Sequence, residues 1–302
     1  MPDGGRRLKV ALALATVYLV WGSSYLATKV MVAEEPPLTA AAYRFLLAAV
    51  ILGSVALWRG ERPPRVRREW RTAALTGLFT VVASNGTNVL AMQHVPSNVA
   101  AMLNATPALW IAWLGTMGRR AVPLSGMARA GLLVGLLGVA LILWPKGGLL
   151  PPDFRWQFVI LLGCLGWSLG TMVYRNDEPT TPTTMFTAMQ MLCGGLGLLA
   201  LAAVSGAPLT LTLEPRGLAA FLWLTLASSC LAYTAYAYLV HNTSPAVVGT
   251  YGYVNPAIAA LIGWLVLGEV LSLTQVLGMM VIFVAVALVT GYLGRWQGGR
   301  LT

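Results

Sequence analysis

Two prolines interrupt long apolar stretches at places where a broken helix exposes polar backbone groups. Pro107 and Pro256 each lie roughly ten residues into an apolar stretch, and a proline inside a helix leaves the carbonyl four residues earlier without its donor. Asn104 and Asn255 place amide side chains at the same depth. Hydrocarbon does not satisfy such groups, so we predict two helix kinks that face a polar cavity able to hold a solute. The alternative is a kink sealed by hydrogen bonds between helices. The carbonyls concerned are those of Leu103 and Gly252.

A second set of polar side chains lies within other apolar stretches. Asn85 and Asn88 are three residues apart and therefore share one face of a helix, as do Tyr233 and Tyr236 further along the chain. Tyr251 lies in the stretch that contains Pro256. These residues either line the same cavity or form hydrogen bonds between helices, and their types and spacing fit both interpretations equally.

Tryptophan supplies the candidate apolar walls of the site. Most of the 11 tryptophans lie near the ends of apolar stretches, where indole rings favour the membrane interface. Trp21 and Trp167 instead lie deep within their stretches. There an indole can present its face to an ammonium group or an apolar side chain. The predicted substrate-binding residues are Trp21, Asn85, Asn88, Asn104, Trp167, Tyr233, Tyr251 and Asn255, with helix kinks at Pro107 and Pro256.

The sequence offers no set of residues for catalysis or for a metal or cofactor site. The two histidines, His94 and His241, lie near the ends of apolar stretches, and the three cysteines form no CxxC pair. No Asp or Glu lies at the centre of a stretch, and the nearest, Glu269, follows the ninth. This pattern predicts a neutral or zwitterionic solute moved down its gradient, or coupling through another group. Lys29 and Arg44 either attract anions or, as is more usual, extend toward the interface.

The apolar stretches predict an all-α integral membrane protein. Only 10% of the 302 residues are charged, 57% are hydrophobic and the mean hydropathy is +0.72. So few charges cannot cover a water-soluble fold, and the net charge of +10 is not gathered on a polar domain that could bind nucleic acid. Windows of about 20 residues predict ten transmembrane helices. They lie near 10–31, 38–58, 72–93, 97–117, 126–144, 156–174, 183–204, 217–240, 246–267 and 275–294.

The positive charges predict the orientation of these helices. Most of the 20 lysines and arginines fall in loops on one side, and such residues resist translocation. Both termini are therefore predicted in the cytoplasm. The first stretch is too long for a secretory signal and has no small-residue cleavage site, so it is interpreted as a membrane span. The predicted location is a bacterial inner membrane, crossed several times.

An internal repeat divides the chain into two halves. A shift of about 146 to 149 residues places Trp21 on Trp167 and Pro107 on Pro256. Residues 1–148 and 149–302 are therefore interpreted as two five-helix repeats. An odd number of spans reverses the direction of the second copy, so a pseudo-twofold axis in the membrane plane would relate the halves. This symmetry predicts a midplane cavity and alternating access.

Four segments carry a resemblance to a known family. These are VWGSSYLATK at 20–29, AYRFLLAAVIL at 42–52, NATPALWIAWLG at 104–115 and NPAIAALIGWLVLGEVLSLTQVLG at 255–278. Their order and spacing resemble the EamA-type carriers of the drug/metabolite transporter superfamily, and most closely the bacterial amino-acid exporters of the YddG type. The resemblance implies ten helices in two inverted halves, cytoplasmic termini and a cavity lined by the residues named above. The first half lacks the LGE motif of the second, so a role for the glutamate of that motif falls to Glu269 alone.

The leading functional hypothesis is a secondary transporter that exports small neutral or zwitterionic metabolites, above all amino acids, including aromatic and other hydrophobic ones. The alternative is a carrier of other metabolites or drugs, such as sugar phosphates, nucleotide sugars or cations. An intramembrane enzyme is not expected, and neither a cofactor nor nucleic acid nor an oligomer is required. The expected partners are a small-molecule substrate and the lipid bilayer. The sequence does not specify the solute, the coupling ion or the direction of flux.

Overall fold

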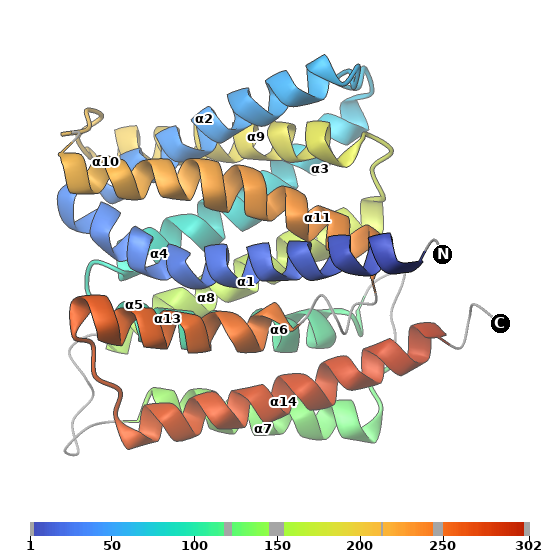
Figure 1. The fold of residues 1–302 in the computed structure, drawn as a ribbon, viewed down its shortest axis with the longest axis vertical. Coiled ribbons are helices and arrows are strands. Elements are labelled where there is room, and N and C mark those ends of the chain that lie inside the picture. The colour runs from blue at the N-terminus through green and yellow to red at the C-terminus, as the bar shows by residue number, and fades with distance from the viewer. Residues whose placement is uncertain (1–2, 118–122, 145–153, 213, 244–249, 299–302) are drawn as a thin grey trace. The chain divides into compact units, whose positions relative to one another are not determined.

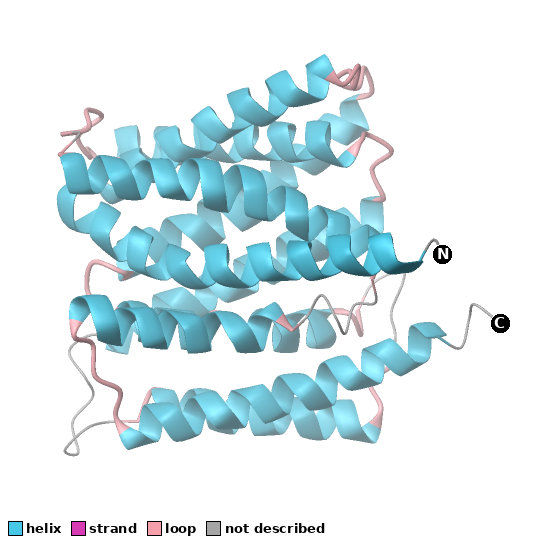
Figure 2. Ribbon diagram, viewed as in Figure 1, coloured by secondary structure: helices cyan, strands magenta, loops and turns pink. Residues whose placement is uncertain are grey.

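The computed structural model describes residues 3–117, 123–144, 154–212, 214–243 and 250–298, and these residues form helices and loops without a strand (Figures 1 and 2). The junction predicted between the halves, at residues 148 and 149, lies outside them. The helices of the first half are α1 (Asp3–Glu34), α2 (Pro37–Trp58), α3 (Arg67–Gly77), α4 (Thr87–Ala91), α5 (Ser97–Leu103), α6 (Pro107–Leu114) and α7 (Gly126–Ile142). Those of the second half are α8 (Phe154–Asp177), α9 (Thr183–Val204), α10 (Pro215–Leu222), α11 (Tyr233–Asn242), α13 (Tyr251–Leu267) and α14 (Leu273–Gly298).

Two segments are wound as π-helix. The first, η1 (Leu78–Gly86), joins α3 to α4, and the second, η2 (Trp223–Ala232), joins α10 to α11. They occupy equivalent places in the third and eighth predicted spans. π-helical turns are rare and occur often at functional sites, and hydropathy does not reveal them.

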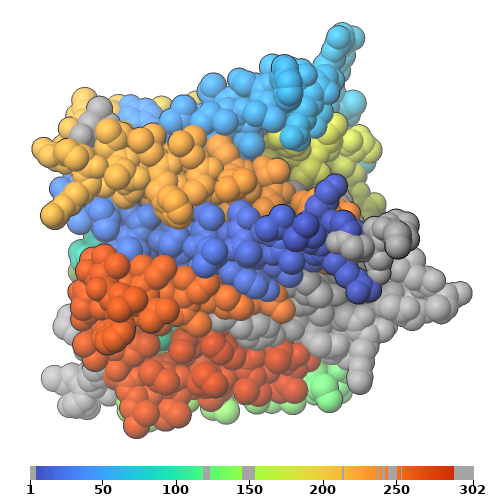
Figure 3. Space-filling model, in the orientation of Figure 1, coloured from blue at the N-terminus to red at the C-terminus, as the bar shows by residue number. Residues whose placement is uncertain are grey.

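Several helices are long and apolar enough to cross a bilayer. In the described residues these are Gly5–Glu34, Pro37–Trp58, Phe154–Asp177, Thr183–Val204 and Pro215–Tyr236, and shorter apolar helices cover Gly126–Ile142, Val254–Leu267 and Leu273–Leu288. Helices α13 and α14 lie side by side on one face of the space-filling view (Figure 3). Outward-facing Trp264, Leu265 and Leu277 expose apolar surface there that suits lipid. The count of ten spans stays a prediction.

The described chain forms two compact units, each built from both predicted halves. The π-segment unit comprises Ala27–Val95 and Phe158–Leu231, and the aromatic unit comprises Met1–Leu26, Pro96–Gln157 and Ala232–Thr302. Sequence order does not predict this interleaving, because contacts between helices far apart in the chain produce it.

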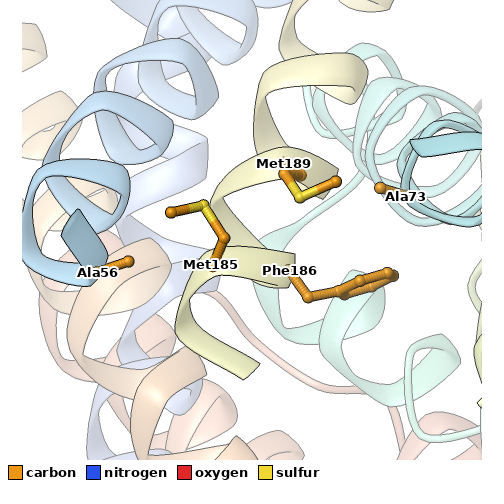
Figure 4. Close-up of a cluster of buried hydrophobic side chains, with 5 residues drawn as sticks. All are labelled: Ala56, Ala73, Met185, Phe186 and Met189. Atoms are coloured by element: carbon orange, nitrogen blue, oxygen red, sulfur yellow. The ribbon is translucent and has the colours of Figure 1, made fainter. Parts of the chain in front are cut away.

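In the π-segment unit, α2 packs along α9. A Cβ on Gly53 would lie 3.8 Å from the Cβ of Ala188, and one on Gly195 would lie 2.9 Å from the Cγ of Leu46, so the two helices run antiparallel. Where α2 and α9 meet α3, a buried cluster fills the space with side chains of mixed size (Figure 4). Its members are Ala56, Ala73, Met185, Phe186 and Met189.

In the aromatic unit, α7 and α14 cross at a pair of glycines. A Cβ on Gly138 would lie 2.7 Å from the Cγ1 of Ile282, and a Cβ on Gly278 would lie 2.7 Å from the Cγ1 of Ile142. The two contacts are equivalent when the helices are exchanged, as a local twofold axis requires. Small residues thus let the two backbones approach closely, which is the usual way that membrane helices associate.

The fourth predicted span is broken at Pro107, but the carbonyl of Leu103 does not stay free. It accepts hydrogen bonds from the backbone nitrogen of Thr106 at 3.1 Å and from the Thr106 hydroxyl at 2.7 Å. Both bonds form within one turn, because a threonine hydroxyl can reach a carbonyl of the preceding turn. That this kink faces a polar cavity stays a prediction. Pro256, in contrast, lies within the continuous helix α13.

Candidate functional site

A cluster of aromatic rings surrounds Trp21 in the aromatic unit. The centroid of its indole lies 5.5 Å from the ring of Tyr233, 5.3 Å from that of Tyr236 and 5.5 Å from that of Tyr251. Tyr236 and Tyr251 also meet edge to face, with centroids 5.8 Å apart. Such edge-to-face and tilted geometries match the quadrupoles of the rings and hold them in defined orientations. The structure thus brings three of the predicted site residues together and adds Tyr236.

Three helices position these rings. Helix α1 approaches α13 at Gly22, where a Cβ would lie 2.6 Å from the Cγ2 of Ile258, so only glycine permits this distance. Trp21 is the neighbour of that glycine and is buried. Tyr233 and Tyr236 share a face of α11, and Tyr251 is the first residue of α13.

Asn255 lies one turn beyond Tyr251 on α13. Its side chain is only 4% exposed, and its Oδ1 has no hydrogen-bond partner in the described part of the chain. Its backbone oxygen lies 3.5 Å from where a Cβ of Gly22 would be, so Asn255 stands beside the helix turn that carries Trp21. A buried acceptor without a donor is costly, so a donor from water or from a ligand is expected there.

The other predicted amides bond to their own helices. Asn104 ends α5 and donates its Nδ2 to the carbonyl of Ala100 at 2.8 Å. Asn85 donates to the carbonyl of Thr80 at 2.8 Å, and Asn88 donates to that of Ser84 at 3.1 Å. All three asparagines are half-buried, so each keeps part of its amide accessible.

Asn85, Asn88 and Trp167 belong to the π-segment unit, whereas the remaining predicted site residues belong to the aromatic unit. Trp167 is half-buried on α8, a helix that approaches η1 through glycines. A Cβ on Gly166 would lie 3.0 Å from the Cβ of Ala83, and one on Gly170 would lie 2.5 Å from the Cγ2 of Thr80. Close packing against the π-helical segment therefore fixes the helix that carries Trp167.

Polar residues of α2 and α9 hold the two π-helical segments. Gln190 donates its Nε2 to the Thr80 hydroxyl of η1 at 2.8 Å, and Arg44 donates its Nε to the Ser229 hydroxyl of η2 at 3.0 Å. A helix of one predicted half thus bonds to the π segment of the other half in both cases. Arg44 and Gln190 each stand seven residues after the first residue of their helix, and this shared position is the sequence signal that could have indicated their roles.

Arg44 and Lys29 both contact groups of the protein itself. Arg44 is 5% exposed, and its guanidinium carbon lies 4.6 Å above the ring centroid of Phe45. Lys29 donates its Nζ to the carbonyls of Met92 at 2.7 Å and Val95 at 3.0 Å. It therefore satisfies carbonyls at and just beyond the end of α4, where a cation suits the helix dipole.

The carboxylates act at helix ends. Glu269 accepts from the backbone nitrogens of Ser97 at 2.7 Å and Asn98 at 3.0 Å, and from the Ser97 hydroxyl at 2.8 Å. It thereby caps α5, whose first amides lack partners within the helix. In the described residues, no group of three or more His, Cys, Asp or Glu side chains is arranged to hold a metal ion.

Glu69 lies in the first turn of α3, at the end of that helix predicted to be cytoplasmic, and it bonds to the loop before α9. Its carboxylate accepts from the backbone nitrogens of Thr180 and Thr181 at 2.9 and 3.2 Å, and from their hydroxyls at 2.8 and 2.6 Å. Burial of the carboxyl raises its pKa, but the hydrogen bonds, that of the Thr181 hydroxyl foremost, outweigh burial and lower the pKa from 4.5 to about 2. Glu69 is therefore charged at neutral pH and fastens α3 to the loop before α9.

Comparison with known proteins gives one family. The model described as the EamA-like transporter family matches residues 8–144 and again residues 154–291. The uncharacterized inner membrane transporter YedA of Escherichia coli (strain K12) is 36% identical over 287 residues, which cover 94% of this chain and 90% of that protein. Protein PecM of Dickeya dadantii (strain 3937) is 28% identical over 274 residues, which cover 89% of this chain and 88% of that protein.

A solved crystal structure has the same fold. It matches with a TM-score of 0.67 at 20% sequence identity and covers 95% of this chain and 98% of that chain. At this identity the likeness concerns the fold alone.

Proposed function

The chain belongs to the EamA-like transporter family, and from this premise we propose that it is a secondary transporter that exports small neutral or zwitterionic metabolites, amino acids first among them. Family membership makes it a multi-pass inner-membrane transporter of the drug/metabolite transporter superfamily, and the names of the family and of its relatives indicate a transporter and not an enzyme. The narrower likeness to YddG-type exporters is part of the proposal.

The aromatic cluster with Asn255 is the observation that carries the proposed substrate class. Three phenol rings surround Trp21, and one turn beyond Tyr251 a buried amide oxygen has an open acceptor position. An amino acid presents both complementary groups, because its ammonium donates hydrogen bonds and its apolar or aromatic side chain packs on rings. Asn85, Asn88, Asn104 and Trp167 are half-buried and stay predicted substrate-binding residues.

Alternating access through two inverted repeats is the proposed mechanism. Three observations support it. The family model matches once within 1–148 and once within 149–302. Both predicted halves carry a π-helical segment in the same place. Equivalent helices also pack on each other, α2 on α9 and α7 on α14, as they do around a twofold axis. The proposal includes cytoplasmic termini.

Counterflow into proteoliposomes tests the substrate class. Proteoliposomes loaded with unlabelled tryptophan or leucine are expected to accumulate the labelled amino acid faster than vesicles prepared without the protein. Trp21→Ala and Asn255→Ala are expected to lower this rate by at least tenfold, because each removes a contact proposed to bind the solute. The matched control is Trp264→Ala, on the exposed face of α13.

Three outcomes are informative. No counterflow above empty vesicles for any neutral amino acid contradicts the proposed substrate class. Uptake of a labelled quaternary ammonium compound in the same vesicles then favours the drug or cation alternative, because rings around an indole also suit a cation. Equal loss in Trp264→Ala contradicts the site but not the substrate class.

A further inference from the structure

The segment between α2 and α3 carries an unusual density of positive charge. Residues 58–71, here the arginine segment, contain six arginines and two glutamates. All six arginine side chains are exposed. They are Arg59, Arg62, Arg65, Arg67, Arg68 and Arg71.

Among the residues that the structure describes, both glutamates of this segment bond to other parts of the π-segment unit and not to the arginines beside them. Glu61 accepts from the backbone nitrogen of Met185 in the first turn of α9 at 3.2 Å. Glu69 binds Thr180 and Thr181 through both carboxylate oxygens. Six arginines against two glutamates leave the segment with a net charge of +4, and all six arginines are exposed whereas Glu69 is buried and Glu61 is half-buried.

Two exposed tryptophans flank five of the six arginines, and hydrogen bonds hold part of the segment in place. Trp58 is 87% exposed and Trp70 is 37% exposed. The indole nitrogen of Trp70 donates to the carbonyl of Pro64 at 3.0 Å, and the guanidinium of Arg68 donates to the carbonyl of Asp177 at 2.7 Å. These two hydrogen bonds therefore hold the arginine segment in a defined conformation.

We propose that the arginine segment binds the phosphate headgroups of anionic phospholipids. Exposed indoles favour the headgroup region of a bilayer, so the arginines that lie between or beside Trp58 and Trp70 are expected near that region. A guanidinium fork matches phosphate oxygens in pairs, and a basic cluster directly beside membrane helices lies within a Debye length of the lipid surface.

Lipid binding to the purified full chain in mixed micelles tests the proposal. Native mass spectrometry would count the bound molecules of phosphatidylglycerol or, in a parallel titration, phosphatidylcholine. Arg62→Gln/Arg65→Gln is compared with Arg155→Gln/Arg216→Gln, which removes the same charge from exposed positions elsewhere. The first pair is expected to weaken phosphatidylglycerol binding by roughly thirtyfold and the second pair by less than about threefold, from the contribution of each basic residue near an anionic surface.

A charge-conserving variant and high salt show whether a loss of lipid binding comes from lost charge or from a disturbed fold. Arg62→Lys/Arg65→Lys keeps the charge and is expected to retain most of the binding, and 1 M salt is expected to abolish it in the unmodified chain. Equal affinity for the two lipids, equal losses in the two Gln pairs, or displacement by inorganic phosphate at the concentration of the lipid would each overturn the proposal. Because the readout is lipid binding, failure of the proposed transport activity leaves this test unaffected.

Discussion

Replacing Glu69 by glutamine tests whether a single carboxylate fastens two parts of the π-segment unit together. The carboxylate accepts four hydrogen bonds, two at each oxygen. Glutamine keeps one acceptor oxygen and turns an amide NH₂ toward the donors of Thr181, so two charge-assisted bonds are lost. We expect the free energy of unfolding to fall by about 2–3 kcal/mol, the range for hydrogen bonds to a charged group.

Equilibrium unfolding in mixed micelles, followed by tryptophan fluorescence, measures this loss. The matched control is Glu214→Gln, because Glu214 also stands at the start of a helix but makes no side-chain capping bond and is exposed. The control is expected to change the free energy of unfolding by less than about 0.5 kcal/mol. Equal losses in the two variants would refute the assigned cap.

The pH dependence gives an independent check of the same cap. The pKa of Glu69 is lowered from 4.5 to about 2 in the folded protein, so its stabilising effect is complete above pH 4.5 and is lost as the pH falls toward 2. The difference in unfolding free energy between the unmodified chain and Glu69→Gln should therefore be constant from pH 7 to 5 and shrink below that. A difference that stays constant down to pH 2 contradicts the assigned pKa.

Three further predictions concern packing and polar contacts. Gly77→Ala should lower the free energy of unfolding by about 1–3 kcal/mol, because its Cβ would lie 2.5 Å from the backbone oxygen of Gln190. The control Gly126→Ala has open space around the new Cβ and should cause no such loss. Thermal unfolding compares the two variants. Glu269→Gln should cost about 1–2 kcal/mol in mixed-micelle unfolding and speed amide exchange in the first turn of α5, because its cap weakens. Gln190→Leu and Thr80→Val should be non-additive, with a coupling energy of about 1 kcal/mol in a double-mutant cycle, and additive losses would contradict their hydrogen bond.

Much of the architecture follows from residue pattern. Long apolar stretches predict the helices, and the family resemblance and inner-membrane location are confirmed. Trp21 was predicted as a cavity wall because an indole lay deep in an apolar helix, and it lies at the centre of a ring cluster. Its role in binding stays a prediction, as does the YddG-type assignment.

Other features were beyond sequence reasoning for identifiable reasons. Proline indicated a freed carbonyl at Leu103, but the hydroxyl of Thr106 satisfies it from within the same turn, a competing local bond that the kink argument omitted. Gln190 and Arg44 each resemble an isolated polar residue in an apolar helix. Their partners lie more than a hundred positions away along the chain, so only the folded arrangement reveals that both hold π-helical segments.

The wide turns of η1 and η2 have a mechanical consequence. A π turn contains one more residue than an α turn, and each α-helical residue advances the helix by about 100° and 1.5 Å. Tightening η2 to α geometry by one residue would therefore screw α11 about its own axis and swing the phenol rings of Tyr233 and Tyr236 to a different side. The same change in η1 would turn the side chain of Asn88 toward a different side of its helix. In each predicted half, a change from π to α geometry in this segment would therefore rotate the side chains of the helix that follows it.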